Sequence, residues 1–284
     1  MQDQTMDSKT HDRLMKGLLY FALGLLAVAS FFPFYLMIIN STRTGVEISR
    51  SFSVIPRGHL VENYKQLIKY VDIPRGIFNS ILVSVPATLL TAYFSALTAY
   101  GLAFYKFKAN KVVFGAILVF MMIPGQLSLI GFYQLCTKLH LVNTYIPLIV
   151  PAVASPGTVF FLRQYALSTV QTTLIEAARI DGAPELYTFH RIIFPILSPG
   201  IATMGIMTFI GNWNSYLLPM IILNKTDKFT LPVMVSTLRS ATDLQQNQGA
   251  TYLAVAISVI PIVLVFSFFS RYIISSISAG AVKG

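Results

Sequence analysis

Cysteine, tryptophan and charged side chains are all scarce in this chain of 284 residues, which has one Cys, one Trp and only 11% charged residues. The single cysteine, Cys136, excludes an intrachain disulfide, and its apolar neighbours predict that it packs as a small buried residue. The low charge, 55% hydrophobic residues and a mean hydropathy of +0.66 exclude a soluble domain of this size. The chain is therefore predicted to lie in a membrane.

Sequence motifs for nucleotide hydrolysis and for common enzymatic chemistry are absent. The chain has no GxxxxGK(S/T) phosphate loop and no room for a nucleotide-binding domain, which argues against ATP hydrolysis by this polypeptide. It also has no HExxH or GxSxG pattern, and its four histidines lie in or beside loops. We therefore expect neither an enzyme nor a bound metal or cofactor.

Long stretches without charge recur six times along the chain. Each contains the roughly 20 apolar residues that a helix needs to cross the hydrocarbon core. Backbone groups in lipid must bond within their own segment, and these stretches lack the alternation of barrel strands, so helices are expected. We predict an all-α membrane protein with six transmembrane helices, in the stretches Gly17 to Thr42, Gly76 to Tyr105, Val112 to Thr137, Leu139 to Leu162, Ile192 to Asn224 and Leu244 to Ser270.

None of these six stretches contains Asp, Glu, Lys or Arg. An ionisable side chain inside the membrane is the usual mark of a proton or ion relay, so its absence argues against a proton-coupled carrier. Sodium coupling through hydroxyls and carbonyls stays open, and an ion-driven secondary carrier is the alternative from a different class.

The local density of Lys and Arg predicts which side of the membrane each loop faces. Their totals on the two sides are nearly equal and do not decide the orientation. The short loop KFKANK, Lys106 to Lys111, contains three lysines and is therefore expected in the cytoplasm, together with the N- and C-termini. No linker is visible, so residues 1–284 are predicted to form a single transmembrane domain. The net charge of +10 is scattered over loops, which favours lipid over nucleic acid as a partner.

The most informative segment is EAARIDGAPELYTFHRIIFP, Glu176 to Pro195, between the predicted fourth and fifth spans. Its residues predict a compact helix–turn–helix elbow over residues 172–195. Either Thr172 or Thr173 is expected to cap the first helix, and Gly182 is expected to supply the positive backbone angle of a tight reversal.

The second helix of this elbow is expected to have Asp181 as its cap and Pro184 in its first turn. Its apolar residues recur three and four positions apart, which predicts a stripe that could lie in a partner's groove, formed by Leu186, Phe189 and Ile193. Pro195 is expected to begin the next span. For His190 we expect surface packing or hydrogen bonding.

This segment resembles the EAA loop of ABC importer permeases, which reads Glu-Ala-Ala, three residues, Gly, nine residues, Ile, any residue, an apolar residue and Pro. Phe194 stands where that family usually has Leu. The wider pattern is similar to the carbohydrate-importing branch, the MalG type. The resemblance implies a type I importer permease fold with a cytoplasmic elbow that contacts an ATPase subunit. The residues it assigns to this contact are Glu176, Ala177, Ala178, Asp181, Gly182, Ile192 and Pro195.

Two polar interruptions of the apolar spans are candidates for the solute path. Sugars present hydroxyls and a weakly apolar ring face, so a site for them needs amides and hydroxyls beside an aromatic ring. Such residues interrupt the predicted fourth and fifth spans; they are Ser155, Gly157, Thr158, Asn212, Trp213, Asn214 and Tyr216. The alternatives are that these residues join transmembrane helices to one another, or that a sister permease holds most of the solute.

Three further segments are similar to parts of the sugar permeases. Residues 57–74 predict an amphipathic helix at the outer face, which either anchors the first span or docks a binding protein. Lys228 to Tyr252 contains the TLPV pattern of an outer loop that faces the binding protein, or is a plain connector. Ser278 to Gly284 matches a C-terminal tail that approaches the ATPase subunits, and by itself reads as a small flexible tail.

The resemblance therefore implies a permease of a binding-protein-dependent ABC importer in a bacterial or archaeal plasma membrane. The expected partners are a second homologous permease, two ABC ATPase subunits that carry ATP and Mg, an extracytoplasmic solute-binding protein and membrane lipid. A di- or oligosaccharide is the expected solute, and glycerol phosphate or a polyamine is the alternative within this class.

Overall fold

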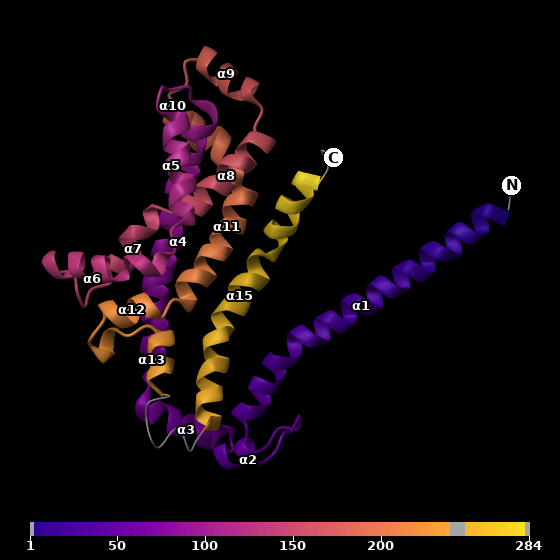
Figure 1. The fold of residues 1–284 in the computed structure, drawn as a ribbon, viewed down its shortest axis with the longest axis vertical. Helices are drawn as coiled ribbons and strands as arrows, with labels where there is room; N and C mark the ends of the chain where they lie inside the picture. The colour runs from indigo at the N-terminus through magenta and orange to yellow at the C-terminus, as the bar shows by residue number, and fades with distance from the viewer. Residues whose placement is uncertain (1–2, 239–247, 282–284) are drawn as a thin grey trace. The chain divides into compact units, whose positions relative to one another are not determined.

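The computed structural model describes residues 3–238 and 248–281, with side chains for residues 13–238 and 248–270. Every regular element in these described residues is helical (Figure 1). The longer helices are α1 (Asp3–Ser41), α3 (Leu60–Tyr70), α4 (Ile73–Phe104), α5 (Asn110–Met122), α6 (Leu129–Lys138), α8 (Pro156–Thr169), α9 (Thr172–Ile180), α11 (Phe194–Asn214), α13 (Leu231–Leu238) and α15 (Gln248–Ala281). The shorter helices are α2 (Gly45–Arg50), α7 (Ile146–Ile149), α10 (Glu185–Thr188) and α12 (Leu217–Ile222).

Five helical segments are long and apolar enough to cross a membrane, and a bent pair provides a sixth if it is one span. The five are Arg13–Ser41, Ile73–Phe104, Ile146–Thr169, Glu185–Asn214 and Gln248–Ser270, and the bent pair is Asn110–Met122 with Gly125–Lys138. The prediction of an all-α membrane protein is therefore confirmed, with five to six spans.

The predicted third span is broken where we expected a continuous helix. The helix axes before and after the break differ by 90°. Ile123 and Pro124 at the break have extended backbone angles, with ψ of 120° and 121°. Proline disfavours the helical conformation of the residue before it and removes an amide donor, so the helix stops here.

The bounds of the fourth and fifth spans also differ from the prediction. The fourth begins at Ile146, since His140 and Asn143 adopt positive φ angles of 55° and 60° in the turn before it. The fifth ends at Asn214, after which the extended Ser215 separates it from α12. In both regions the apolar composition continues through a turn, and therefore hides the helix boundary.

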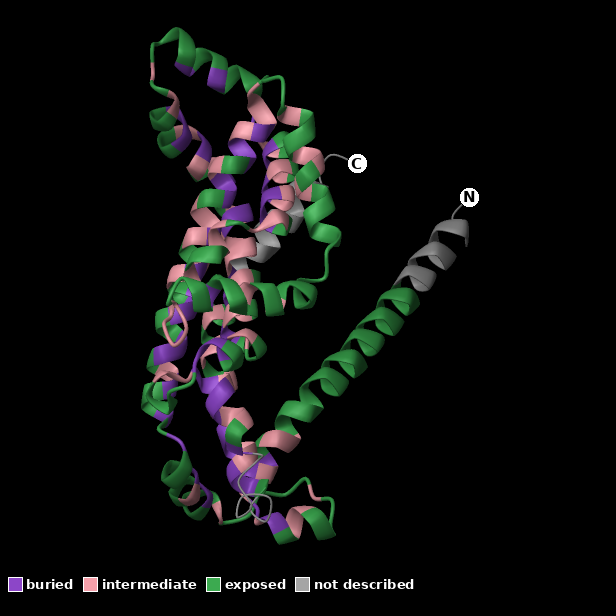
Figure 2. Ribbon diagram, turned by 60° about the vertical axis from the view of Figure 1, so that its left-hand side comes forward, coloured by how far each residue is buried: buried purple, intermediate pink, exposed green. Residues whose placement is uncertain are grey.

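Contacts divide the chain into two compact units. The first contains Met1–Tyr70 and Leu238–Ile257, and the second contains Val71–Thr237 and Ser258–Gly284. In the first unit, Figure 2 shows the helix α1 exposed along most of its length. An apolar helix with this exposure is suited to contact with lipid or with another membrane subunit.

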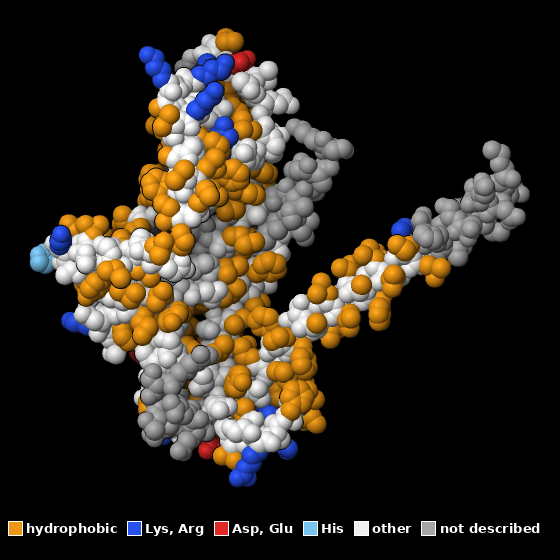
Figure 3. Space-filling view, viewed as in Figure 1, with side chains coloured by type: hydrophobic (Ala, Val, Ile, Leu, Met, Phe, Trp, Pro, Cys, Tyr) orange, Lys and Arg blue, Asp and Glu red, His pale blue; other side chains and the backbone are white. Residues whose placement is uncertain are grey.

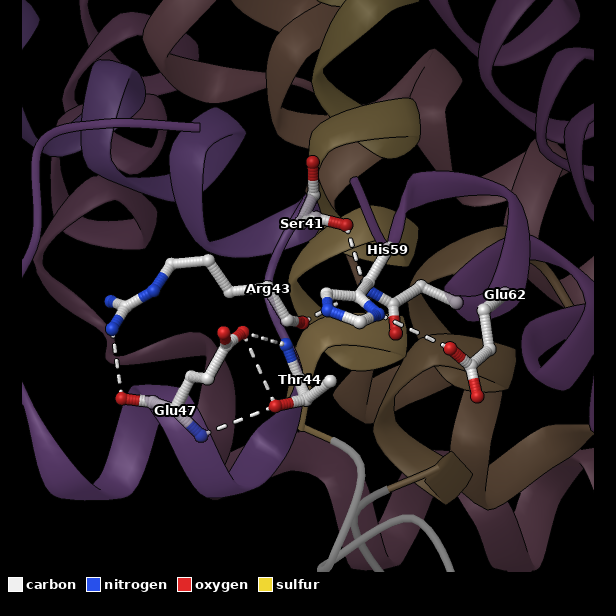
Figure 4. Close-up of polar contacts among 7 residues, drawn as sticks. Ser41, Arg43, Thr44, Glu47, His59 and Glu62 are labelled. Atoms are coloured by element: carbon white, nitrogen blue, oxygen red, sulfur yellow. Dashed lines mark hydrogen bonds and ion pairs between the residues drawn. The ribbon is translucent and has the colours of Figure 1, made fainter. Parts of the chain in front are cut away.

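A polar cluster fixes the turn that follows α1 in the first unit (Figure 4). The guanidinium of Arg43 is buried and donates to the carbonyls of Glu47 and Ser51, at 2.8 and 2.7 Å. Thr44 and Glu47 form a reciprocal capping box at the start of α2. The backbone N–H of Thr44 holds the pKa of Glu47 below its usual range. The carboxylate of Glu47 therefore stays charged to a lower pH than a free glutamate does.

The core of the second unit lies where α4, α8 and α11 pack together. Small residues on α4, including Ala96 and Ala99, let the helices approach closely, while Leu162, Phe189 and Leu197 fill the space between them. All five side chains are fully buried. This packing holds the segments on either side of the elbow against one rigid helix.

Gly200 on α11 is required for this close packing. A Cβ atom built there would lie 2.7 Å from Cδ1 of Tyr165 on α8, whereas one at Gly205 of the same helix would meet nothing within 4 Å. We expect Gly200→Ala to lower the free energy of unfolding by about 1–3 kcal/mol, as overpacking does. Gly205→Ala should be neutral or stabilise by up to about 1 kcal/mol, since alanine favours the helix.

The comparison of these two alanine variants is a melting experiment in detergent, followed by size-exclusion chromatography after heating. A lower melting temperature for Gly200→Ala alone is the expected result. Equal melting temperatures would show that Tyr165 moves aside and that α8 and α11 are not tightly packed at this point.

Candidate coupling site and solute path

The elbow forms as a short helix, a tight reversal and a second helix. Helix α9 ends in a turn in which the N–H of Gly182 bonds to the carbonyl of Arg179 at 3.1 Å, and the N–H of Ala183 bonds to the carbonyl of Ala178 at 2.9 Å. Gly182 has a φ of +73°. These bonds are those of a glycine-terminated helix end, and the predicted positive angle at Gly182 is confirmed.

The predicted helix caps of the elbow are wrong. Helix α9 begins at Thr172 itself, and Gln171 precedes it without a side-chain cap bond. Asp181 ends α9 instead of starting the next helix. Pro184 occupies the cap position of α10 and not its first turn. The two extra residues of the reversal, Gly182 and Ala183, separate Asp181 from the second helix, so its carboxylate is too early in the chain to cap it.

The second helix of the elbow continues into the fifth span without interruption. The N–H of Phe194 bonds to the carbonyl of Phe189, five residues earlier, so residues Phe189–Ile193 form one wide turn. Pro195 lacks an N–H and could not make the ordinary bond to Arg191. Pro195 therefore lies in the first turn of α11, as expected for a proline at a helix start, but the continuous span that contains α11 begins ten residues earlier, at Glu185.

The predicted apolar stripe is also wrong for two of its three residues. Phe189 and Ile193 are fully buried in the core of the second unit, and only Leu186 is exposed. Ile192 is half-buried and Pro195 is exposed. Helical spacing predicted a shared face correctly, but this face packs against α4 of the same chain instead of a partner.

Helix α9 provides the surface that a partner could contact. Glu176, Ala177 and Asp181 are exposed, and the side chain of Ile180 is 86% exposed. Ala178 is buried on the opposite face, so Ala177 alone of the alanine pair faces outward. An exposed isoleucine flanked by two carboxylates is costly on a free surface and suits a complementary protein surface.

A polar brace holds the angle between α9 and α10. The guanidinium Nε of Arg179 donates to Glu185 Oε1 at 2.8 Å, and the hydroxyl of Tyr100 donates to Glu185 Oε2 at 3.1 Å. Arg179 also lies over the ring of Tyr105, at 5.2 Å from its centroid. Burial raises the pKa of Tyr105, so its phenol stays neutral. The elbow is thereby tied to the end of α4.

His190 makes a second link between the elbow and α4. Its Nδ1 lies 2.7 Å from the carbonyl of Leu186, its Nε2 lies 3.1 Å from the hydroxyl of Tyr93, and its ring stacks on Tyr93. The expected role in packing and hydrogen bonding is confirmed. Sequence analysis did not identify Arg179, Glu185, Tyr93 or Tyr100, because each contact joins residues that are distant in the chain or lie across the turn.

The candidates of the fourth span lie at the start of α8. Ser155 precedes this helix, and its hydroxyl lies 2.8 Å from that of Thr158, which is buried. Gly157 is exposed, and a Cβ atom built there would meet nothing within 4 Å. The hydroxyls of Ser155 and Thr158 therefore bond to each other at the first turn of α8, while Gly157 leaves the backbone accessible.

The candidate residues of the fifth span differ in exposure: Trp213 is buried, whereas Asn214 and Tyr216 are exposed. Trp213 is 1% exposed, stacks on Phe209 and donates its indole N–H to the carbonyl of Ser258 at 3.0 Å. It packs inside the second unit and presents no open face. Tyr216 is 47% exposed and Asn214 is exposed, while Nδ2 of Asn212 is buried without a hydrogen-bond partner among the described residues. Tyr216 is therefore the aromatic ring that a solute could reach.

The three outer and terminal segments are described in part. Helix α3 covers most of residues 57–74, with Leu67 fully buried and Leu60, Tyr64 and Ile68 about half exposed. Within Lys228 to Tyr252, the TLPV pattern leads into α13, and residues 239–247 lie outside the described residues. Within Ser278 to Gly284, helix α15 continues to Ala281, and residues 282–284 lie outside the described residues.

Comparison with known proteins identifies the family of this chain. Residues 89–279 match the family model of the binding-protein-dependent transport system inner membrane component. The chain belongs to this family of ABC importer permeases. The permease is thus a multi-pass inner-membrane protein and a member of a binding-protein-dependent ABC transporter complex, in which separate subunits carry the ATPase activity.

Individual relatives cover nearly the whole permease. It is 34% identical to the arabinooligosaccharides transport system permease protein AraQ of Halalkalibacterium halodurans, over 95% of this chain and 98% of the relative. It is 32% identical to the lactose transport system permease protein LacG of Rhizobium radiobacter, over 93% and 95%. Its fold matches a chain from the crystal structure of a bacterial ABC transporter involved in the import of the acidic polysaccharide alginate, with a TM-score of 0.78, 20% identity, and 92% and 97% coverage.

Metal binding has no support in the part of the permease that the structure describes. Across residues 3–238 and 248–281, no group of three or more His, Cys, Asp or Glu side chains could hold a metal ion. The buried Cys136 packs with Leu148, Ile222 and Leu223, as its apolar neighbours in the sequence predicted.

Proposed function

We propose that this permease forms part of the membrane pathway of an importer for di- or oligosaccharides. The observation that carries the proposal is its identity of 34% and 32%, over nearly the full chain, to permeases named for arabinooligosaccharides and for lactose. A neutral polyhydroxylated solute also agrees with the candidate path residues Asn212, Asn214 and Tyr216, whose side chains are polar and uncharged.

The proposed assembly pairs this permease with a second, homologous permease, two ATPase subunits and an extracytoplasmic solute-binding protein. The exposed face of α9 around Glu176 and Ile180 is the contact for an ATPase subunit. We further propose that the elbow and both termini lie in the cytoplasm, which requires the bent pair Asn110–Met122 and Gly125–Lys138 to cross the membrane as one span. Residues 1–284 are proposed to form one permease domain. ATP and Mg bind to the partner subunits.

The continuity of α10 with α11 explains how the elbow could drive alternating access. The span Glu185–Asn214 has 30 residues, which corresponds to about 45 Å of helix. At one end Glu185 is bonded to Arg179 of α9, and the other end carries Asn212, Trp213 and Asn214, with Tyr216 just beyond it. A displacement of the elbow on ATP binding would therefore move the Asn212–Tyr216 segment without passing through a flexible joint.

Within this proposal, the solute path uses Tyr216 as a platform for a sugar ring. Asn214, Asn212, Gly157 and the Ser155–Thr158 pair supply amide, backbone and hydroxyl groups. Trp213 does not contact the solute in this proposal. Its hydrogen bond to the carbonyl of Ser258 holds the end of α11 in place. A ring stacked on Tyr216 would be oriented by these polar groups.

The proposed function is tested by solute uptake into proteoliposomes that contain the complete complex. The panel is radiolabelled arabinotriose, lactose, sn-glycerol 3-phosphate and spermidine, each with the corresponding binding protein, with and without internal ATP. ATP-dependent uptake of a neutral oligosaccharide is expected. Selective uptake of glycerol phosphate or spermidine would assign another solute, and uptake by the permease alone under a sodium gradient would identify a secondary carrier.

Replacing Glu176 with lysine is expected to remove ATPase subunits from the purified complex. The carboxylate lies on the exposed face of α9, so reversing its charge opposes a matching cation on the partner without disturbing the core. We expect roughly a 10-fold or greater loss of retained ATPase, as for a charge at an interface that contributes about 1.4 kcal/mol or more. Glu62→Lys on α3 is the matched control and should retain ATPase normally. Equal retention in both variants would place the contact elsewhere.

A further inference from the structure

A basic pocket lies beside the elbow in the second unit. It has a volume of about 520 Å³ and is lined by residues from the end of α4, the following loop, the start of α5 and the middle of α8. Lys106, Lys108, Lys111 and Arg163 all line it. Among the described residues that form its wall there is no Asp or Glu, and none of the four cations takes part in an ion pair with another described residue. The positive charge of this pocket is not neutralised by the protein, so the pocket is suited to bind an anion.

The loop that shapes this pocket is held in place by hydrogen bonds. The side chain of Asn110 donates to the carbonyls of Leu102 and Tyr105, at 3.2 and 3.0 Å. The N–H of Asn110 bonds to the carbonyl of Phe107 at 3.0 Å. The three lysines are therefore presented by a closed turn. They also surround the start of α5, where the helix dipole adds positive potential.

Arg163 lines the pocket from a helix that is long and apolar enough to span the membrane. It lies within the span Ile146–Thr169, and its guanidinium carbon is 4.0 Å from the centroid of Phe114 on α5. Its Nε donates to the carbonyl of Leu102 at 3.4 Å, while its terminal nitrogens have no hydrogen-bond partner among the described residues. Aromatic contact and one backbone bond thus orient a cation whose remaining donors face the pocket.

The mixture of cationic and apolar side chains that line the pocket favours a lipid over other anions. The pocket is lined by three lysines and also by the apolar residues Leu102 and Phe107. It lies beside Phe104, where the span formed by α4 ends. A phosphodiester with attached acyl chains satisfies the cations and the apolar wall together. An acidic protein surface would reach the exposed lysines but not Arg163 inside the span. Figure 3 shows Lys and Arg side chains gathered at the end of the second unit that carries α9 and α10.

We infer that this basic pocket binds the phosphate of an anionic phospholipid in the leaflet next to the elbow. The inference rests on the proposed function for the placement of that leaflet at the cytoplasmic side. Arg163 and the lysines of the loop bind the phosphate, and Phe107 contacts the start of the acyl chains. Through Tyr105, which borders both the pocket and Arg179, a bound lipid stiffens the connection between α4 and the elbow.

The test measures lipid retained by the full-length permease, co-expressed with its partner subunits, after extraction into micelles of equal phosphatidylglycerol and phosphatidylcholine. Native mass spectrometry counts each lipid bound to the wild type and to the triple variant Lys106→Gln, Lys108→Gln, Lys111→Gln. The control is Lys65→Gln, Lys69→Gln, Lys138→Gln, which removes three exposed cations elsewhere. Arg163→Gln is measured separately, because its side chain also packs on Phe114.

We expect the wild type and the control to retain phosphatidylglycerol in preference to phosphatidylcholine. In the loop variant, the ratio of bound phosphatidylglycerol to bound phosphatidylcholine should be at least five-fold lower. Arg163→Gln should show a similar loss while its elution volume is unchanged. Equal lipid preference in all proteins would overturn the inference. Displacement of the lipid by 10 mM inorganic phosphate would show a site for a free anion.

Partner binding in the same samples separates this inference from the proposed function. Loss of ATPase in the loop variant with unchanged lipid retention would overturn the lipid site in favour of a protein contact. Loss of lipid preference with ATPase retained is the expected combination. If the wild type retains lipid selectively but no ATPase, the pocket stands and the proposed assembly fails.

Discussion

Substituting proline for Gly182 is expected to abolish ATP-dependent uptake while the permease remains folded in the membrane. Gly182 has a φ of +73°, which the proline ring cannot adopt, and its N–H bonds to the carbonyl of Arg179. The reversal between α9 and α10 would therefore not form. Because a Cβ at this position meets nothing within 4 Å, the effect comes from the backbone and not from a collision.

Graded substitutions at Gly182 make this prediction sharper. Valine can reach the left-handed conformation only at a cost of about 1–2 kcal/mol, which corresponds to roughly 5- to 30-fold fewer correctly formed elbows. Asparagine tolerates this conformation and is the matched control. Uptake in proteoliposomes should therefore decrease in the order glycine, asparagine, valine, proline.

Retention of ATPase subunits by the same variants distinguishes loss of contact from loss of coupling. A proline variant that binds ATPase and hydrolyses ATP without uptake would show an elbow that docks but does not transmit movement. A proline variant with normal uptake would contradict the coupling role of the elbow. The fold of the membrane spans should be unaffected in every case, since Gly182 lies on the exposed turn.

Replacing Gly249 with valine is expected to give the largest loss of stability in the first unit. A Cβ atom there would lie 2.1 Å from the carbonyl oxygen of Arg43 and 2.5 Å from Nδ2 of Asn63. The same Nδ2 donates to the carbonyls of Ser41 and Arg43, at 2.8 and 2.9 Å. Any side chain at Gly249 must therefore separate α15 from this turn or break both hydrogen bonds.

The cost combines two effects on this buried contact. Overpacking costs about 1–3 kcal/mol, and a buried polar group that loses its partner costs about 1–3 kcal/mol more. The measurement is thermal unfolding of purified Gly249→Val, with protease sensitivity of residues 41–59 as a local readout. Gly58→Val is the matched control, because a Cβ at Gly58 in the same unit meets nothing within 4 Å. Equal melting of the two variants would show that α15 does not pack on the turn.

The elbow illustrates how much local sequence reasoning could predict. A glycine between two amphipathic segments is sufficient to predict a reversal, and Gly182 does adopt the left-handed angle. The cap at Asp181 was wrong because chain length, not residue type, decides which helix end a side chain reaches. The orientation of Phe189 and Ile193 was wrong because spacing predicts a common face without saying which neighbour covers it.

The same limit applies to the membrane spans and to the solute path. Charge-free stretches located the spans, but Pro124 and the turn at His140 to Asn143 were needed to locate their ends. The aromatic content of the fifth span indicated a platform, yet the indole of Trp213 is buried and Tyr216 is exposed. Side-chain exposure depends on packing between helices that are far apart in the sequence.

The sequence by itself determined that this protein is a helical membrane protein, that it contains a reversal at Gly182 between two short helices and that no phosphate loop accompanies it. These properties follow from composition and from short-range spacing, which act within a few helical turns. Only the tertiary structure decided that Arg179, Glu185 and Tyr100 brace the elbow and that Arg163 meets three lysines in one pocket. Such contacts depend on which helices pack together, because hydrogen bonds and ion binding require side chains within a few ångströms.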